Sequence, residues 1–133
     1  MTVAEIRELA RSCGFELAGV AAALPLEDGS RYHAWVESGF AGEMGYLTDR
    51  RAGVRDDPRN LLATARSVIC VGKLYQTPWP HSTAYSDSER AWISRYAWGD
   101  DYHDVVKEKL LSLLAWIREQ EPNAAGKVCV DIS

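Results

Sequence analysis

The fold class of this chain is decided by one apolar run, Ser67-Val68-Ile69-Cys70-Val71-Gly72-Lys73-Leu74-Tyr75. Residues 68–71 are apolar in succession, without the polar alternation of a strand that has one face in solvent. A short continuous apolar run is typical of a strand that is covered on both faces. We therefore predict a central strand over 67–75, buried on both faces.

Two helices are predicted to flank this strand in sequence. At the N-terminus, Thr2 and Glu5 form a capping box, and the helix that they begin ends at Gly14. In the C-terminal half, apolar residues keep a 3-4 spacing from about Asp101 to Gln120. We expect the helix over 101–120 to pack on one face of the sheet.

Shorter elements complete the prediction. Strands are expected over 15–21 and over 127–133, and a short helix over 31–38. In the last strand, alternation puts Val128, Val130 and Ile132 on one face and Cys129, Asp131 and Ser133 on the other. Helices that alternate with apolar strands indicate an α/β domain with a mixed central sheet flanked by helices.

Length and composition favour one globular domain. The chain has 133 residues, of which 47% are hydrophobic and 26% are charged. It holds no run of about 18 apolar residues that would cross a membrane, and its first residues lack the pattern of a secretory signal. Because the sequence stops directly after a predicted strand, we expect it to be a fragment of a longer protein.

Charge and cysteine content limit the function classes. The net charge is −4, from 15 Lys and Arg against 19 Asp and Glu, so any contact with nucleic acid should be local. Cys13, Cys70 and Cys129 are far apart and form no C-x-x-C pair. This pattern fits a reducing cytoplasm and argues against a thiolate-ligated zinc or iron–sulfur site. We interpret all three as small buried hydrophobic residues.

Two segments resemble anion sites but have plainer interpretations. The glycine-rich stretch over 39–47 follows a predicted helix and lacks a Gly-Lys-Ser/Thr sequence, so a tight turn is favoured over a phosphate loop. Arginines alternate with aspartates over 49–59, which favours a solvated, ion-paired face over an RNA-backbone contact. The arginines are Arg50, Arg51, Arg55 and Arg59.

Three places hold residues with useful chemistry. Around 95–103, Asp100 or Asp101 either caps the next helix or helps form an anion site, and His103 is either structural or a ligand contact. Asp131 is either an exposed terminal carboxylate or, if partly buried, a proton donor. In the long loop over 76–89, Trp79, His81 and Tyr85 either stack on a planar ligand or plug a core.

The segment Ile93-Ser94-Arg95-Tyr96-Ala97-Trp98-Gly99-Asp100-Asp101-Tyr102-His103 resembles the S-R-Y-A-x-G-x-D-Y-H signature of epoxyqueuosine reductases. Further segments are similar to family motifs in the same order and extend the resemblance over the whole chain. They are Gly14–Val20, the stretch from Trp35 to Leu47, Arg55–Leu62 and the pair Val130-Asp131.

This resemblance implies an oxidoreductase that uses cobalamin and two 4Fe-4S clusters to reduce epoxyqueuosine to queuosine at the wobble position of tRNA. It also implies a fold similar to the nitroreductase-like, cobalamin-binding domain of reductive dehalogenases. It assigns Asp131 as the catalytic proton donor. The cofactor-binding residues that it implies are Arg95, Tyr96, Asp101, Tyr102 and His103, and no metal ligand is expected in the chain.

This sequence departs from the family pattern in two ways that bear on its expected activity. Ile132 stands where the family has Ser or Thr, and the cysteine-rich region that would hold the clusters is absent from this sequence. Residues 1–133 are therefore expected to be the N-terminal cobalamin-binding domain of a cytoplasmic enzyme, inactive alone. The tRNA would be held mainly by the missing part, with no membrane or DNA contact.

Three alternatives stay open at this point. The first is a stand-alone module that binds or transfers cobalamin. The second is a non-catalytic interaction domain, in which the signature only packs. The third is a reductive dehalogenase, although proteins of that class are usually exported and no export signal is present here.

Overall fold

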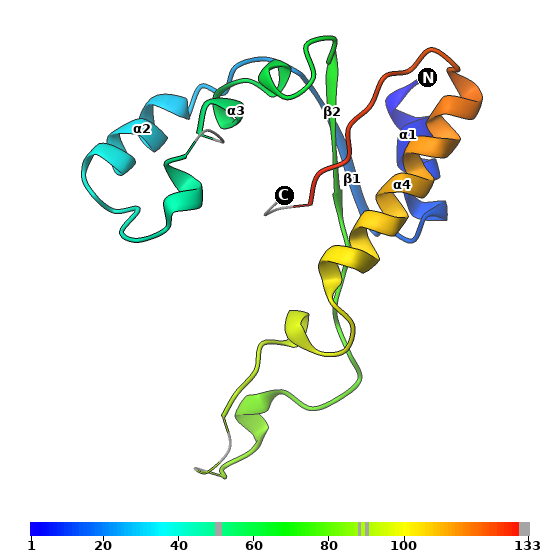
Figure 1. The fold of residues 1–133 in the computed structure, drawn as a ribbon. Coiled ribbons are helices and arrows are strands. Elements are labelled where there is room, and N and C mark those ends of the chain that lie inside the picture. Colours follow the sequence, from blue (N-terminus) through cyan, green and yellow to red (C-terminus); the bar gives the residue numbers. More distant parts are fainter. Residues whose placement is uncertain (50–51, 88, 90, 131–133) are drawn as a thin grey trace. The chain divides into compact units, whose positions relative to one another are not determined.

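The computed structural model describes residues 1–49, 52–87, 89 and 91–130 (Figure 1). Contacts divide the chain into two compact units. The first contains residues 1–19 and 71–124, with 128–130 from the C-terminal end, and the second contains residues 20–70 and 125–127. Among the described residues, no helix is long and apolar enough to cross a membrane.

Helix α1 (Val3–Ser12) begins and ends as its sequence predicts. The Thr2 hydroxyl accepts a hydrogen bond from the backbone N–H of Glu5, and the Glu5 carboxylate accepts one from the backbone N–H of Thr2. Each side chain satisfies an N–H group that has no partner in the first helical turn, so the predicted capping box is confirmed. Gly14 follows the helix with φ +82°, a left-handed conformation that glycine adopts without strain.

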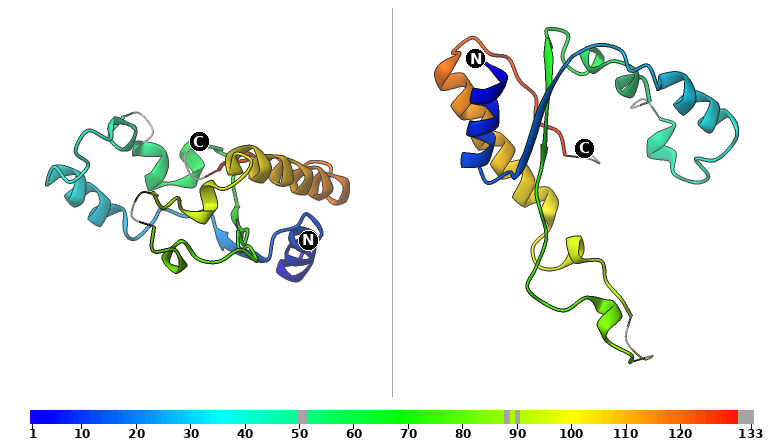
Figure 2. Two further views of the ribbon diagram at one scale, coloured as in Figure 1. Left: turned by 90° about the horizontal axis from the view of Figure 1, so that it is seen from below. Right: turned by 180° about the vertical axis from the view of Figure 1, so that it is seen from behind.

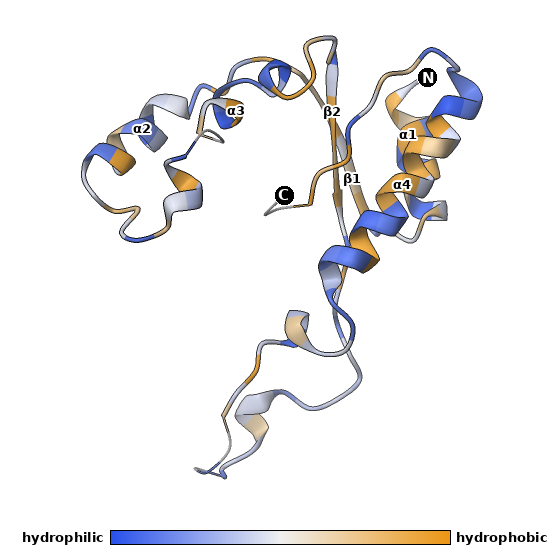
Figure 3. Cartoon of the chain, in the orientation of Figure 1, coloured by the Kyte–Doolittle hydropathy of each residue, from blue (hydrophilic) through white to orange (hydrophobic). Residues whose placement is uncertain are grey.

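Helix α4 (Tyr102–Gln120) is the predicted long helix, and it lies beside α1 in the first unit (Figure 2). Apolar residues of the two helices gather where they lie against each other (Figure 3). Ala10 in α1 and Leu113 in α4 are buried, and Phe15 just after α1 is 1% exposed. The Lys109 ammonium of α4 donates to the Cys13 carbonyl at the end of α1. This pair therefore contains the best-packed residues of the first unit.

The sheet consists of two antiparallel strands, β1 (Leu17–Ala22) and β2 (Ser67–Gly72). Its register follows from the hydrogen bond between Ala23 N and Arg66 O at one end and from the proximity of Leu17 to Gly72 at the other. The predicted mixed central sheet is therefore wrong for the described residues. The predicted burial of this strand on both faces is also wrong, because β2 has one neighbouring strand among the described residues and none of its residues is buried.

The other strand predictions need correction as well. β2 ends at Gly72 and not at Tyr75, and Leu74 and Tyr75 are exposed. Residues 127–130 form no strand, although Val128 and Val130 are half-buried and Cys129 between them is exposed. The expected alternation of burial is present there, but these residues are not in a strand, and residues 131–133 lie outside the described residues.

The cysteine interpretation is only partly right. All three cysteines are free, but Cys70 and Cys129 are exposed and only Cys13 is half-buried. Burial raises the pKa of the Cys13 thiol, while the nearby Lys109 ammonium lowers it by a smaller amount. Cys70 is exposed although Ile69 and Val71 beside it in β2 are half-buried, so an apolar neighbourhood in sequence did not become a buried one.

The second unit contains helices α2 (Gly29–Glu37) and α3 (Ala52–Asp56) and the 3-10 helices η1 (Gly45–Leu47) and η2 (Pro58–Asn60). The Tyr32 hydroxyl of α2 donates to the Leu47 carbonyl of η1. His33 Nε2 lies 2.8 Å from the carboxylate of Asp56. The glycine-rich stretch forms a tight turn, as predicted, with Gly39 at φ +76° and the Gly42 N–H bonded to the Gly39 carbonyl.

Candidate functional site

The candidate site starts at the N-terminus of α4, where Asp101 is the cap residue. Its carboxylate accepts a hydrogen bond from the backbone N–H of His103 at 2.9 Å and lies 2.7 Å from His103 Nδ1. The backbone bond and then the ring bond hold the pKa of Asp101 below its ordinary value. Asp101 is therefore an anion at neutral pH that caps the helix and orients the imidazole.

Orientation of His103 has a chemical consequence. A carboxylate only accepts hydrogen bonds, so the Nδ1 atom of the neutral ring carries the proton and donates it to Asp101. Nε2 is then the acceptor atom of the ring. A carboxylate that holds one ring nitrogen and so fixes the orientation of the imidazole is an arrangement found in many ligand-binding and proton-transfer histidines.

Aromatic contacts join Tyr96 to this helix start. The Tyr96 ring meets the Tyr102 ring edge-on, with centroids 5.8 Å apart and planes at 87°. The Tyr102 ring lies 4.0 Å from the His103 imidazole. We call Tyr96, Asp101, Tyr102 and His103 the Tyr96–His103 cluster. The side chain of Tyr96 is 53% exposed, so the cluster presents an aromatic ring to a ligand.

Arg95 is directed toward the loop that follows β2. Its Nη2 atom donates to the Trp79 carbonyl at 2.6 Å and its Nη1 atom to the Thr77 carbonyl at 3.3 Å. The guanidinium also lies 5.7 Å from the centre of the Trp98 ring, within cation–π range. Arg95 therefore connects the 3-10 helix η4 (Arg95–Ala97) to the loop, and its side chain is not part of the Tyr96–His103 cluster.

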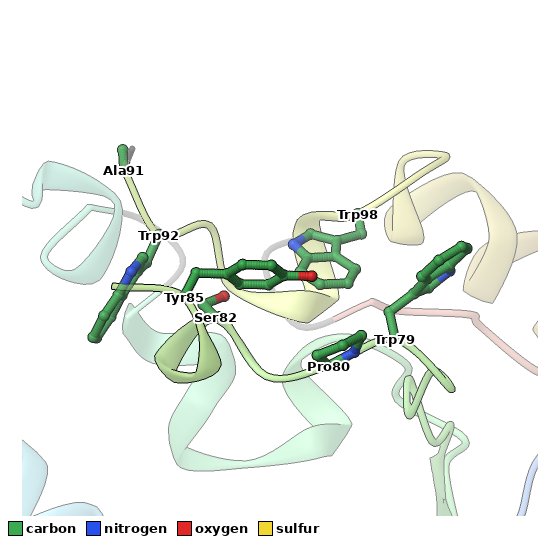
Figure 4. Close-up of a pocket in the computed structure, with 7 residues that line it drawn as sticks. All are labelled: Trp79, Pro80, Ser82, Tyr85, Ala91, Trp92 and Trp98. Atoms are coloured by element: carbon green, nitrogen blue, oxygen red, sulfur yellow. The ribbon is translucent and has the colours of Figure 1, made fainter. Parts of the chain in front are cut away.

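Beside Arg95, aromatic side chains surround an open hollow of about 390 Å³ (Figure 4). We call it the aromatic hollow. It is formed by the loop after β2, the 3-10 helix η3 (Ser82–Ala84) and the segment before α4. The lining residues are Trp79, Pro80, Ser82, Tyr85, Ala91, Trp92 and Trp98.

Part of this hollow was expected from the sequence. Trp79 and Tyr85 were named with two possible roles, and their 68% and 53% exposure excludes the role of plugs over a core. His81 is exposed and does not line the hollow. Trp92 and Trp98 were missed, although the density of aromatic residues over 92–98 was the signal that pointed to them.

The remaining candidates have different outcomes. Asp131, the expected proton donor, lies outside the described residues. Among the described arginines, Arg59 forms a forked ion pair with Asp57 at 2.6 Å, and that hydrogen bond lowers the pKa of Asp57. The ion-paired interpretation is confirmed there, whereas Arg50 and Arg51 lie outside the described residues. In the described part of the chain, no group of three acidic, His or Cys side chains is arranged to hold a metal ion.

Comparisons with known proteins agree on one family. A family model described as epoxyqueuosine reductase QueG, DUF1730, matches residues 55–132. The epoxyqueuosine reductase of Gloeobacter violaceus is 38% identical over 132 residues, which are 98% of this chain and 39% of that protein. The epoxyqueuosine reductase of Synechocystis sp. is 38% identical over 105 residues, 79% of this chain and 34% of that protein.

A solved structure supports the same likeness at the level of the fold. The structure of epoxyqueuosine reductase from Streptococcus thermophilus matches with a TM-score of 0.66 and 25% sequence identity. The match covers 90% of this chain and 32% of the other. The chain thus spans about two fifths of the length of the curated relatives that it matches.

Proposed function

The chain belongs to the epoxyqueuosine reductase family, and from this premise we propose that it is the N-terminal, cobalamin-binding part of an enzyme that reduces epoxyqueuosine to queuosine in tRNA. The observation that carries the proposal is local. Within the family-like signature over 94–103, a capping carboxylate orients the His103 imidazole, and the half-buried Tyr102 ring connects that imidazole to the exposed Tyr96. Family membership supports the proposed reaction, and the Tyr96–His103 cluster supports the proposal that these residues contact the cofactor.

The residues of the cluster fit a large planar macrocycle that carries amide side chains. Tyr96 offers an exposed ring face for apolar contact, and Asp101 holds the His103 ring in a fixed orientation beside Tyr102. When bound, cobalamin supplies electrons for reduction of the epoxide. Tyr96, Tyr102 and His103 would contact it, while Asp101 would hold His103 in place and Arg95 would position the adjacent loop.

The residues do not fit iron–sulfur clusters. Cluster iron is bound by grouped thiolates, whereas the three cysteines here are free, and two of them are exposed at separate places in the sequence. No step is therefore assigned to clusters on this chain. We propose that cluster ligands and most tRNA contacts belong to the remaining part of the family's polypeptide, and that residues 1–133 alone do not turn over.

A proton donor is needed for the proposed reaction. Opening of one epoxide C–O bond leaves an alkoxide, and loss of its oxygen as water requires cleavage of the second C–O bond, two electrons and two protons in total. Asp131 is proposed for this role on the resemblance of Val130-Asp131 to the family motif. In a full-length family member that carries this segment, Asp131→Ala should abolish reduction and leave cobalamin affinity unchanged. Undiminished turnover would contradict the role.

Two further points belong to the proposal. The fold would be related to the nitroreductase-like, cobalamin-binding domain of reductive dehalogenases, with the described α/β elements as one part of it. The enzyme would work in the cytoplasm, where free thiols such as the exposed Cys70 and Cys129 stay reduced.

A spectral titration tests the cofactor proposal directly. Purified chain would be titrated with cob(II)alamin and with hydroxocobalamin, and saturable binding with a shifted visible band is expected. Tyr96→Ala and His103→Ala should weaken this binding. Trp116→Ala is the matched control, because Trp116 is 38% exposed on α4 and lies outside the cluster. Absence of binding by a chain whose circular dichroism shows it folded would refute a cobalamin site on these residues.

A further inference from the structure

We propose that the aromatic hollow binds one unpaired nucleobase of an RNA loop, stacked against its indole rings. This inference rests on the proposed function, because it takes tRNA to be the substrate. It adds a contact that the Tyr96–His103 cluster does not explain. It concerns a neighbouring base of the RNA and not the base that is reduced.

The first reason is the exposure of the rings. Trp79, Tyr85 and Trp92 are 68%, 53% and 63% exposed, and Trp98 is 36% exposed. Large aromatic side chains normally lose most of their contact with water on folding, since burial of such a ring contributes about 2 kcal/mol or more. Single exposed apolar residues are normal on a protein surface, whereas several exposed rings that line one hollow form a contiguous patch and indicate a contact surface.

The second reason is that parts of the hollow are held in place without a ligand. The Trp98 indole N–H donates to the Ile93 carbonyl at 2.9 Å, which fixes the plane of that ring. Arg95 donates to the backbone carbonyl of Trp79 and lies over the ring of Trp98. One side chain therefore holds the backbone at Trp79 and contacts the indole face of Trp98. A site whose walls are positioned in advance loses less conformational entropy when a ligand enters.

The third reason is the chemistry of the lining. In the view of Figure 4, the rings of Trp92, Tyr85, Trp98 and Trp79 line the hollow. Besides the aromatic rings, the lining contains Pro80, Ala91 and the hydroxyl of Ser82. Flat aromatic walls suit a flat aromatic ligand, and every nucleobase has a face that can stack on them. The hollow is open, so a base can enter while its sugar and phosphate remain in solvent.

One positive charge next to a lining ring agrees with this occupant. The Arg95 guanidinium stands at the Trp98 ring and is a favourable neighbour for the phosphate attached to a stacked base. The whole chain carries a net charge of −4, so RNA is not expected to bind along a broad basic surface. A single stacked base beside one arginine is the kind of local contact that an acidic chain can make.

The test measures binding of an RNA hairpin that has the size of an anticodon stem-loop and a fluorescent label. Fluorescence anisotropy would compare the wild-type chain with Trp79→Ala and Trp92→Ala, at one fixed salt concentration. Loss of one stacking partner should weaken binding by between about 5-fold and 150-fold. Trp79→Phe should restore much of the affinity. Trp116→Ala, which removes an exposed indole outside the hollow, should leave affinity unchanged.

A second arm replaces the loop nucleotides of the RNA, one at a time, by an abasic residue. One abasic position should weaken binding to the wild-type chain. The same RNA should bind the Trp92→Ala variant about as tightly as the unmodified RNA does, which would show that this base and the Trp92 ring contact each other. Equal affinity of the wild type and both alanine variants would overturn the inference, and so would an absence of RNA binding by the wild-type chain. Either failure would leave the cobalamin titration, and with it the cofactor part of the proposed function, unaffected.

Discussion

The helix pair and the aromatic hollow place large side chains in opposite environments. Beside α1 and α4, Phe15 is 1% exposed and Leu113 is 3% exposed. In the hollow, Trp79 and Trp92 are 68% and 63% exposed. Aromatic content by itself therefore says little about where the core lies. A ring that lies between packed helices contributes to folding, whereas rings that surround an open space are available to a ligand.

The two regions also differ in how their backbone is held. Side-chain caps begin both α1 and α4, through Thr2 and Asp101. The 3-10 helices η3 and η4 that flank the hollow have no side-chain cap. The segment is instead held by the bonds of Arg95 to the Thr77 and Trp79 carbonyls. Local signals in the sequence therefore stabilise the helix pair, while one long-range side chain positions the hollow.

The largest expected effect is on the stability of the packed region. Phe15→Ala removes the largest fully buried side chain of the described residues and should lower the free energy of unfolding by about 3–5 kcal/mol. Urea unfolding followed by circular dichroism measures this loss. A loss below about 1 kcal/mol would mean that Phe15 is no better packed than the rings of the hollow, and the comparison would fail.

A smaller effect is expected at the end of α1. Gly14→Ala forces a side chain onto a residue at φ +82° and should lower the free energy of unfolding by about 1–2 kcal/mol. The new Cβ would lie 3.0 Å from Lys109 Nζ, which is the flexible end of its side chain and can move away. Gly19→Ala is the control, because Gly19 has no atom within 4 Å of its Cβ position and should not be destabilised. Equal losses in both variants would contradict this reason.

A pH-dependent effect is expected at the ends of the strands. The Lys73 ammonium, and then the Leu74 N–H, hold the pKa of Glu16 at about 2, below its ordinary value of 4.5. Because the folded-state pKa is lowered, this contribution to stability is present above pH 4.5 and is lost as the pH falls through about 2. Glu16→Gln should therefore be less stable than wild type at neutral pH.

Unfolding of wild type and Glu16→Gln at a series of pH values checks this prediction. The difference in the free energy of unfolding should shrink between pH 4.5 and about 2. It should also be smaller in a Lys73→Met background, which lacks the main partner of the carboxylate. A difference that is independent of pH would point to packing of the Glu16 side chain and not to its charge.

The smallest effect on stability is expected in the hollow. This result would separate the hollow most clearly from the packed pair of α1 and α4. Trp92→Ala removes a ring that is 63% exposed and should change the free energy of unfolding by less than about 0.5 kcal/mol. The same variant should lose RNA affinity in the anisotropy assay. A stability loss comparable to that of Phe15→Ala would show that the ring belongs to a core, and the proposed stacking site would lose its main support.

The sequence predicts some parts of the candidate site and not others. The helix start at Asp101 and the neighbouring Tyr102 and His103 could be placed because capping and helical periodicity are short-range properties. That Arg95 turns toward the loop carbonyls could not be predicted, because its partners lie 16 and 18 residues away. The exposure of Trp92 and Trp98 was also undetermined, since the same aromatic pattern suits a core and a binding surface.

By itself, the sequence determined the family, the capping box of Thr2 and Glu5, the end of α1 at Gly14 and the span of α4. Each of these depends on neighbouring residues or on a motif that can be read directly. Long-range packing determines that, among the described residues, β2 pairs only with β1, that Cys70 is exposed and that aromatic rings line a hollow. The physical reason is that burial depends on which distant segments cover a surface, and an apolar run is the same sequence whether it is covered or not.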